Sequence, residues 1–136
     1  MHGIRSGTAA LIALALLPSS GFAAEPYEGA WAKTSRECND PDGATSLTII
    51  GLNVNIEGKP RAMVEQYEHH CFIDRKSTVC SDTTVTATCY EFWDDFKQKV
   101  NGRKETIKLS VASKDTLKID GKPYRRCPEK GTRKRP

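Results

Sequence analysis

Five cysteines constrain this chain more than any other feature, because their spacing limits which segments can lie side by side. Cys80 lies midway between Cys71 and Cys89, nine residues from each. If segments 67–74 and 85–93 pair as a hairpin that turns near Cys80, then Cys71 and Cys89 stand opposite one another, at a separation that a cross-strand disulfide can bridge. The spacing therefore predicts a Cys71–Cys89 disulfide and leaves Cys80 as a free thiol in an exposed loop.

The two remaining cysteines, Cys38 and Cys127, are expected to form a second disulfide that ties the ends of the domain together. The chain-entropy model gives about 4.5 kcal/mol for closing that long loop and about 3 kcal/mol for the shorter Cys71–Cys89 loop. A zinc site is the competing use of cysteine, and the triplet His69-His70-Cys71 invites it. The chain has no C-x-x-C pair to complete a tetrahedral site, so we predict no metal and no cofactor.

Residues 1–23 have the pattern of a cleavable export signal. Arg5 is followed by an uncharged stretch from Ala9 to Leu17, which is shorter than the roughly 20 apolar residues that span a bilayer. Small residues at Gly21 and Ala23 predict cleavage after Ala23, with Ala24 as the alternative. Because disulfides persist in oxidising compartments, we expect a periplasmic or secreted protein without a transmembrane segment.

Positive charge is concentrated at the C-terminus. Removing the signal removes Arg5 and no acidic residue, so the 21 basic residues become 20 against 17 acidic ones. Proline, glycine and charged residues follow Cys127, which predicts a disordered tail over 128–136. An anionic surface is the partner that this charge attracts, but no interleaved aromatic residues indicate specific nucleic-acid binding. The basic residues of this region are Arg125, Arg126, Lys130, Arg133, Lys134 and Arg135.

Short segments of alternating apolar and polar residues predict the fold. Strands are expected over 30–34, 46–56, 64–75, 83–93, 103–111 and 116–120. The alternation changes register at Gly51, which predicts a bulge or tight turn where glycine adopts a positive φ. Apolar positions 92, 93, 96 and 100 also fit a short helix near 92–100. The pattern predicts a mainly β domain over 24–127, a small antiparallel barrel or sandwich of six to eight strands.

The triplet Gly29-Ala30-Trp31 at the start of the first strand resembles the G-x-W motif of lipocalin-like and other calycin barrels. This resemblance implies that a basic residue late in the chain, Arg125 or Arg126, packs across the face of Trp31. The overall layout also resembles small uncharacterised exported proteins of rhizobia and related alphaproteobacteria, and this second resemblance implies no particular activity.

The candidate binding residues lie around the predicted hairpin. In its register, His69 faces Glu91, and Tyr67 faces Trp93 on the Cys71–Cys89 side. A histidine with a carboxylate can act as a general base with its orienting group, although a cross-strand polar pair at the barrel rim is the simpler interpretation. Phe92 and Trp93 are expected either in the core or at the lip of a binding groove, because aromatic rings offer large contact areas.

These observations favour a non-enzymatic exported protein that binds a small apolar ligand or a protein partner. An inhibitor of a lytic enzyme such as lysozyme is one version, although a basic tail repels a basic enzyme. The alternative is a secreted host-interaction or virulence effector delivered by a specialised secretion system. A small hydrolase is third, because Asp94 and Asp95 are adjacent on an expected strand, point to opposite faces and cannot flank one glycosidic bond.

Overall fold

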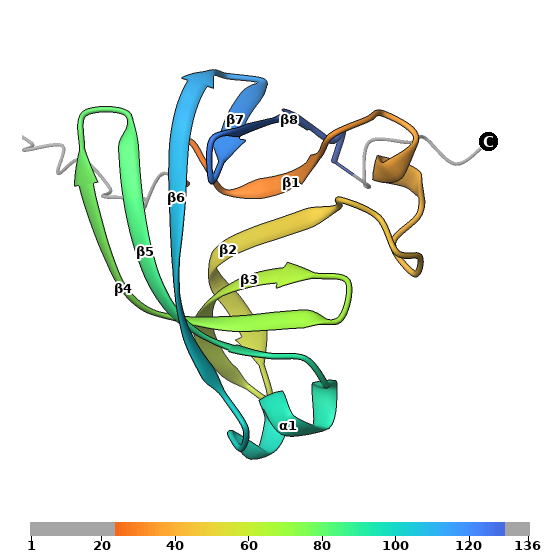
Figure 1. Cartoon of the computed structure of the whole chain (residues 1–136), viewed down its shortest axis with the longest axis vertical. Helices are drawn as coiled ribbons and strands as arrows, with labels where there is room; N and C mark the ends of the chain where they lie inside the picture. Colours follow the sequence, from red (N-terminus) through yellow and green to blue (C-terminus); the bar gives the residue numbers. More distant parts are fainter. Residues whose placement is uncertain (1–23, 130–136) are drawn as a thin grey trace, which may run out of the picture.

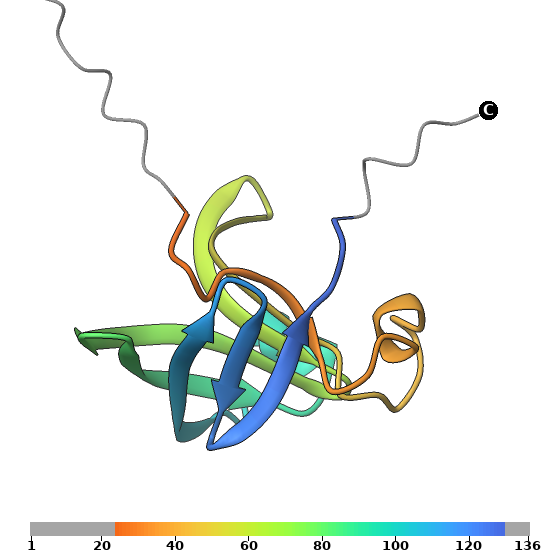
Figure 2. The same cartoon turned by 90° about the horizontal axis from the view of Figure 1, so that it is seen from above.

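Residues 24–129 are described by the computed structural model, in which eight antiparallel strands form a closed barrel (Figure 1). Each strand pairs with its neighbours in sequence, and β1 pairs with β8 to close the sheet. Figure 2 shows this closure from above, with β1 in orange beside β8 in blue. The expected mainly β fold is confirmed. The strands are β1 (Gly29–Ala32), β2 (Thr48–Ile56), β3 (Lys59–Gln66), β4 (His69–Val79), β5 (Asp82–Tyr90), β6 (Arg103–Ser113), β7 (Thr116–Ile119) and β8 (Lys122–Arg126).

Tight turns connect most of the strands. Glu57-Gly58 joins β2 to β3 and Asp120-Gly121 joins β7 to β8, with a positive φ at all four residues. Two consecutive positive φ angles are the mark of a type I′ turn, whose twist matches that of the flanking strands. The expected single strand over 64–75 is wrong, because a turn at Tyr67-Glu68 divides it into β3 and β4. That turn contains no glycine, proline or asparagine, so the sequence carried no signal for it.

Alternation directs one face of each strand into the barrel. Eight strands enclose a space that side chains can fill, and here buried residues from β1 to β8 fill it together with Tyr27. The barrel axis is therefore a packed core. Its buried members are Tyr27, Trp31, Ile50, Val64, Cys71, Val85, Ala87, Cys89, Ile107, Leu109, Leu117, Ile119 and Tyr124.

Both predicted disulfides are present. Cys71 and Cys89 are direct partners in the β4–β5 ladder, with Cα atoms 4.0 Å apart. Cys38, in the 3₁₀ turn η1 (Glu37–Asn39), is bonded to Cys127 just after β8. Cys80 is an exposed free thiol between β4 and β5. The cysteine spacing therefore gave the correct register for the hairpin on which the sheet is built.

Gly51 and Gly29 are required for different physical reasons. The β2–β3 register shifts between Gly51 and Val54, which confirms the bulge, but Gly51 does not adopt a positive φ. A Cβ atom there would lie 2.5 Å from Val54 Cγ2, so Gly51 is required for space. Gly29 of the G-x-W triplet has a φ of 124°, and a Cβ atom would lie 2.8 Å from Arg126 Nη1. That position excludes larger residues both by conformation and by contact.

Arg126 makes the contact that the barrel resemblance implied. Its Cζ atom lies 4.1 Å from the centroid of the Trp31 ring. Arg125 and Arg126 lie in β8, which continues to Arg126 because it pairs with β1. Counting these two residues with the basic tail was therefore wrong. The predicted export signal (1–23) and Lys130, Arg133, Lys134 and Arg135 lie outside the described residues.

A single helix, α1 (Trp93–Gln98), packs on the outside of the barrel and confirms the helix expected near 92–100. It buries Phe96 against Met63 and Tyr90, whose side chains leave the sheet on the face opposite to the core. Within the described part of the chain, no helix is long and apolar enough to cross a membrane.

Candidate functional site

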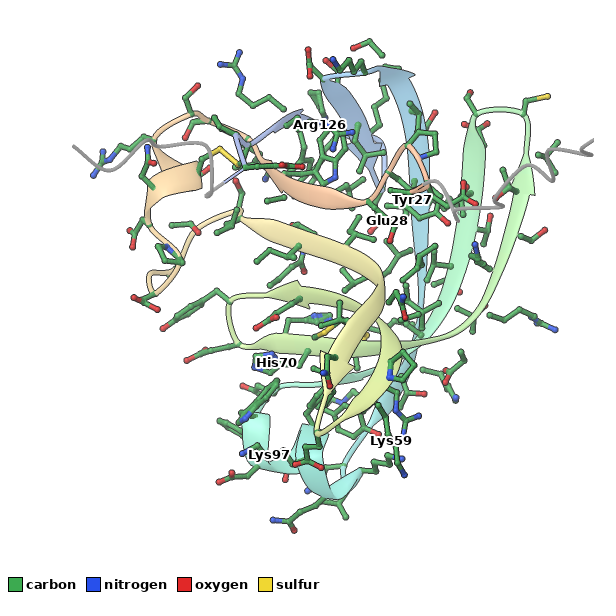
Figure 3. The ribbon with its side chains drawn as sticks, turned by 180° about the vertical axis from the view of Figure 1, so that it is seen from behind. Tyr27, Glu28, Lys59, His70, Lys97 and Arg126 are labelled. Atoms are coloured by element: carbon green, nitrogen blue, oxygen red, sulfur yellow. A yellow bond between two sulfur atoms is a disulfide. The ribbon has the colours of Figure 1, made fainter. Side chains whose placement is uncertain are left out.

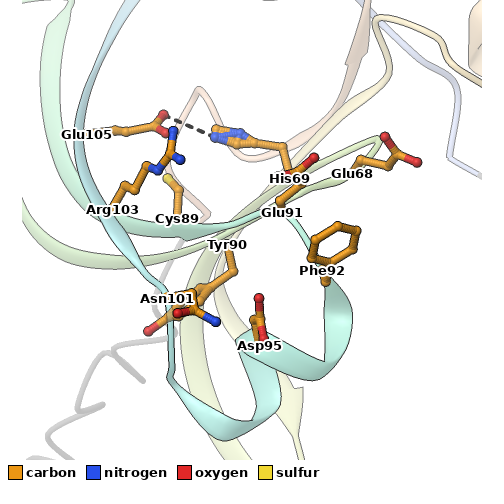
Figure 4. A pocket seen from close by; sticks show the side chains of 10 residues that line it. All are labelled: Glu68, His69, Cys89, Tyr90, Glu91, Phe92, Asp95, Asn101, Arg103 and Glu105. Carbon is orange, nitrogen blue, oxygen red and sulfur yellow. Dashed lines mark ion pairs between the residues drawn. The ribbon is translucent and has the colours of Figure 1, made fainter.

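A polar pocket of about 310 Å³ lies between the β4–β5 ladder, the start of β6 and α1 (Figure 4). It brings together three of the five predicted binding residues, His69, Glu91 and Phe92. The sequence interpretation did not include the residues that β6 contributes, Arg103 and Glu105. Its lining is Glu68, His69, Cys89, Tyr90, Glu91, Phe92, Asp95, Asn101, Arg103 and Glu105.

The partner of His69 is Glu105, whereas the sequence predicted Glu91. His69 Nε2 lies 3.0 Å from Glu105 Oε2, a distance suited to an ion pair when the ring is protonated, although the contact lacks hydrogen-bond geometry. The predicted register is correct, but Glu91 follows the end of β5, whereas Glu105 points inward from β6. The signal for Glu105 was its place two residues before Ile107, on the inward-facing side of the same strand.

The chemistry of this pocket is limited by the disulfide beside it. Its lining contains no serine or threonine. Its one cysteine, Cys89, is bonded to Cys71 and therefore has no free thiol. His69, Cys71 and Cys89 have ligand atoms within 4.8 Å of one another, but both sulfur atoms belong to the disulfide. Of these three residues, only the imidazole remains as a metal ligand. The pocket can hold a polar or cationic group, and the side chain beside its imidazole is the carboxylate of Glu105.

The two aromatic residues that were predicted to face one another, Tyr67 and Trp93, do not. Tyr67 is in the β3–β4 turn, where 46% of its surface is exposed, and it lines a separate shallow depression with Glu65 and Ile49. Trp93 is the first residue of α1 and is 39% exposed. The expectation failed because both segments were taken as strand, whereas one is a turn and the other a helix.

A second depression, about 530 Å³ in volume, lies between the β2–β3 hairpin and α1. We call it the cationic groove, because four of its ten lining residues are basic and only Glu57 is acidic. Figure 3 shows Lys59 and Lys97 at the same end of the molecule, away from Arg126. The lining consists of Asn55, Ile56, Glu57, Lys59, Arg61, Phe72, Trp93, Phe96, Lys97 and Lys99.

Three aromatic rings form the floor of the cationic groove. Phe96 is stacked on Trp93 with centroids 4.8 Å apart, and on Phe72 with centroids 4.0 Å apart, each pair within about 15° of parallel. Phe96 is fully buried, as expected for the middle ring of a stack. Phe96 therefore covers part of both outer rings, and cations lie over these two rings as well.

Those cations come from β3, from α1 and from the residue that caps α1. Lys97 Nζ lies 5.7 Å from the Trp93 centroid, while Arg61 Cζ and Lys99 Nζ lie 5.5 and 5.9 Å from the Phe72 centroid. Between residues 24 and 129, the ion pairs and side-chain hydrogen bonds involve none of the four groove cations. The contact of Lys97 with Trp93 could have been expected from the sequence, since Lys97 follows Trp93 by one helical turn. The approach of Lys59 and Arg61 depends on how the β2–β3 hairpin folds over α1.

His70 supports the ring stack from the side. Its ring lies edge-on to Trp93, with centroids 5.1 Å apart, and its Nδ1 is 3.8 Å from Glu65 Oε1. Burial lowers the pKa of His70, and the Glu65 carboxylate opposes that effect. Burial thus favours the neutral ring, which packs against the indole.

Comparisons of the chain with protein-family models, with curated proteins and with solved structures found no match. The assignment of function therefore depends on the geometry of these two sites.

Proposed function

We propose that this protein is an exported, non-enzymatic binding protein that engages a negatively charged partner with the outside of its barrel, at the cationic groove. The observation that carries the proposal is the set of four basic side chains that line one depression and form no ion pair with a carboxylate among residues 24–129. Export remains part of the proposal, supported by the N-terminal pattern and by the two disulfides.

The packed interior supports an outer binding surface. A small apolar ligand inside a barrel needs a cavity along the axis, and here Trp31, Leu109 and Leu117 are almost completely buried within one core. A ligand there would have to displace that packing. The surface outside the barrel needs no such rearrangement.

Charge complementarity supports an anionic partner. Unpaired cations held close together repel one another, and a bound anion relieves that repulsion while it gains charge-assisted hydrogen bonds. The aromatic floor keeps the cations in place through cation–π contacts, so less conformational entropy is lost when the partner binds.

Retention of residues 24–136 on a heparin resin, as a general polyanion, tests the proposal. We expect the wild-type chain to be retained and Arg61→Gln/Lys97→Gln to elute at clearly lower salt. The matched control is Lys118→Gln/Lys122→Gln, which removes the same charge from exposed positions on β7 and β8 and should elute close to the wild type. Equal shifts in the two variants, or no retention of the wild type, would contradict the proposal.

The absence of catalysis needs a separate measurement. Hydrolysis of a panel of ester, peptide and glycoside substrates should not exceed the background rate. A turnover that disappears in His69→Ala or Glu105→Gln would instead make the polar pocket an active site.

A further inference from the structure

The cationic groove limits which kind of anion can occupy it. Resting on the function proposed above, we infer that its occupant is a carboxylated oligosaccharide, a short chain of uronic-acid sugars. The inference follows from what the groove offers to a ligand and from what it has already used internally.

The aromatic rings are not free to stack on a nucleobase. Phe96 is stacked on both Trp93 and Phe72, and Lys97 and Arg61 lie over these two rings. Single-stranded nucleic acids are held by stacking successive bases on open aromatic faces. The groove presents charges above its rings, so it lacks the main contact that such a ligand needs.

The groove offers an extended peptide a strand edge but no pockets. The β3–β4 ladder runs only from Met63–Phe72 to Gln66–His69, so Lys59 to Arg61 of β3 pair with β2 alone. A peptide that adds to an edge gains its specificity from pockets for alternate side chains. The most apolar part of the groove, Phe96, is fully buried and offers no socket for an apolar anchor residue. An acidic peptide would therefore find main-chain partners and charge there but no side-chain pocket, and the competition experiment below tests it against the saccharide.

A uronic-acid chain matches what remains. Arg61 presents a planar fork of N–H donors that suits a carboxylate, and Lys59, Lys97 and Lys99 add point charges around it. Asn55, with an exposed side chain on the same hairpin, can donate to and accept from sugar hydroxyls. The volume of about 530 Å³ lies within the range of small-molecule sites, which suits a few sugar units.

The test is a titration of residues 24–136 with a trimer of galacturonic acid, followed by NMR of the tryptophan indole N–H groups. The chain contains two tryptophans, one in the groove and one buried in the core, so Trp31 serves as an internal reference for Trp93. We expect a saturable shift of the Trp93 signal and an unchanged Trp31 signal. The neutral galactose trimer should leave both signals in place.

Variants connect the binding to the groove. Arg61→Gln/Lys97→Gln should weaken trimer binding by at least roughly tenfold, while Lys118→Gln/Lys122→Gln should change it by less than about twofold. Equal losses in the two variants would overturn the inference, because the trimer would then respond only to net charge.

Competition separates this inference from the proposed function. If poly-glutamate or a single-stranded oligonucleotide displaces the trimer and binds more tightly through Arg61 and Lys97, the saccharide assignment is wrong while anion binding by the groove stands. If the heparin resin does not retain the wild-type chain, the proposed function is wrong and the saccharide inference is overturned with it.

Discussion

Cations lie over aromatic rings at two ends of this molecule, but the two arrangements differ in what the cations do with their donors. Arg126 covers Trp31 and donates to the backbone carbonyls of Lys114, Glu28 and Pro26, at 2.9, 2.8 and 2.9 Å. In the cationic groove, Arg61 covers Phe72 without a hydrogen bond or ion pair of its own to another residue between 24 and 129.

The difference teaches how to separate a structural cation from a binding cation. Arg126 has used its guanidinium to join the chain before β1 to the turn after β6, so it has little left for a ligand. Three of the groove cations, Arg61, Lys97 and Lys99, have used only their positive charge, in weak contacts with rings. Donor use therefore distinguishes the two ends better than charge does, and the measurements below test that distinction.

The largest effect is expected from the covalent link at the Arg126 end. Cys38→Ser/Cys127→Ser should lower the free energy of unfolding by about 4.5 kcal/mol, because this disulfide closes a separation of 89 residues. Cys71→Ser/Cys89→Ser, whose separation is 18 residues, should cost about 3 kcal/mol. Urea titrations monitored by circular dichroism give both values, and a reversed order would show that the core near Cys71 matters more than the chain ends.

The second largest effect is the difference in unfolding free energy between alanine variants of the two tryptophans. Trp31→Ala removes a fully buried ring from the core and should cost about 4 kcal/mol. Trp93→Ala removes a half-exposed ring and one stacking contact, and should cost about 1 kcal/mol. Far-ultraviolet circular dichroism in urea measures both without depending on indole fluorescence. Equal losses would mean that the aromatic stack is a second core rather than the floor of a binding site.

Replacing each arginine by lysine tests donor use directly. Arg126→Lys keeps the charge but cannot reach three carbonyl oxygens, so we expect a loss of about 1 to 3 kcal/mol. Arg61→Lys breaks no side-chain hydrogen bond to the part of the chain that the structure describes, and should stay within about 0.5 kcal/mol of the wild type. Thermal unfolding of the two variants side by side provides the comparison, and a destabilised Arg61→Lys would make that residue structural.

The smallest effect concerns an exposed lysine that does have a protein carboxylate. Lys104 Nζ lies 2.8 Å from Asp74 Oδ2. The hydrogen bond from Lys104, followed by that from Thr88, lowers the pKa of Asp74. Because the folded pKa is lowered, the pair stabilises the fold above the pKa of the unfolded chain, near 3.9, and this contribution is lost as the pH falls through the folded pKa.

The pH dependence can be measured as the difference in unfolding free energy between the wild type and Asp74→Asn. We expect a small positive difference at neutral pH that disappears in acid, since Lys104 is 70% exposed and solvent screens the pair. A difference that does not change with pH would show that the hydrogen bond to Thr88 acts without the charge.

The sequence predicted the register of the central hairpin because cysteine spacing and strand alternation agree there. It also predicted α1 and, as one of two alternatives, the bulge near Gly51, while the contact of a late arginine with Trp31 was implied by the resemblance to calycin barrels. It missed the turn at Tyr67-Glu68, because Glu68 adopts a positive φ without any of the residues that usually mark one. It chose Glu91 for His69, because two-strand reasoning cannot include a third strand that lies beside the pair.

By itself, the sequence determined that this chain forms a disulfide-linked β-sheet, since spacing and alternation are local properties of the polymer. Only the tertiary structure decided that the sheet closes around a filled axis and that Arg61 and Lys97 share one groove. The physical reason is that closure and the approach of β3 to α1 depend on packing between segments more than 25 residues apart. Such packing leaves no periodic trace in either segment.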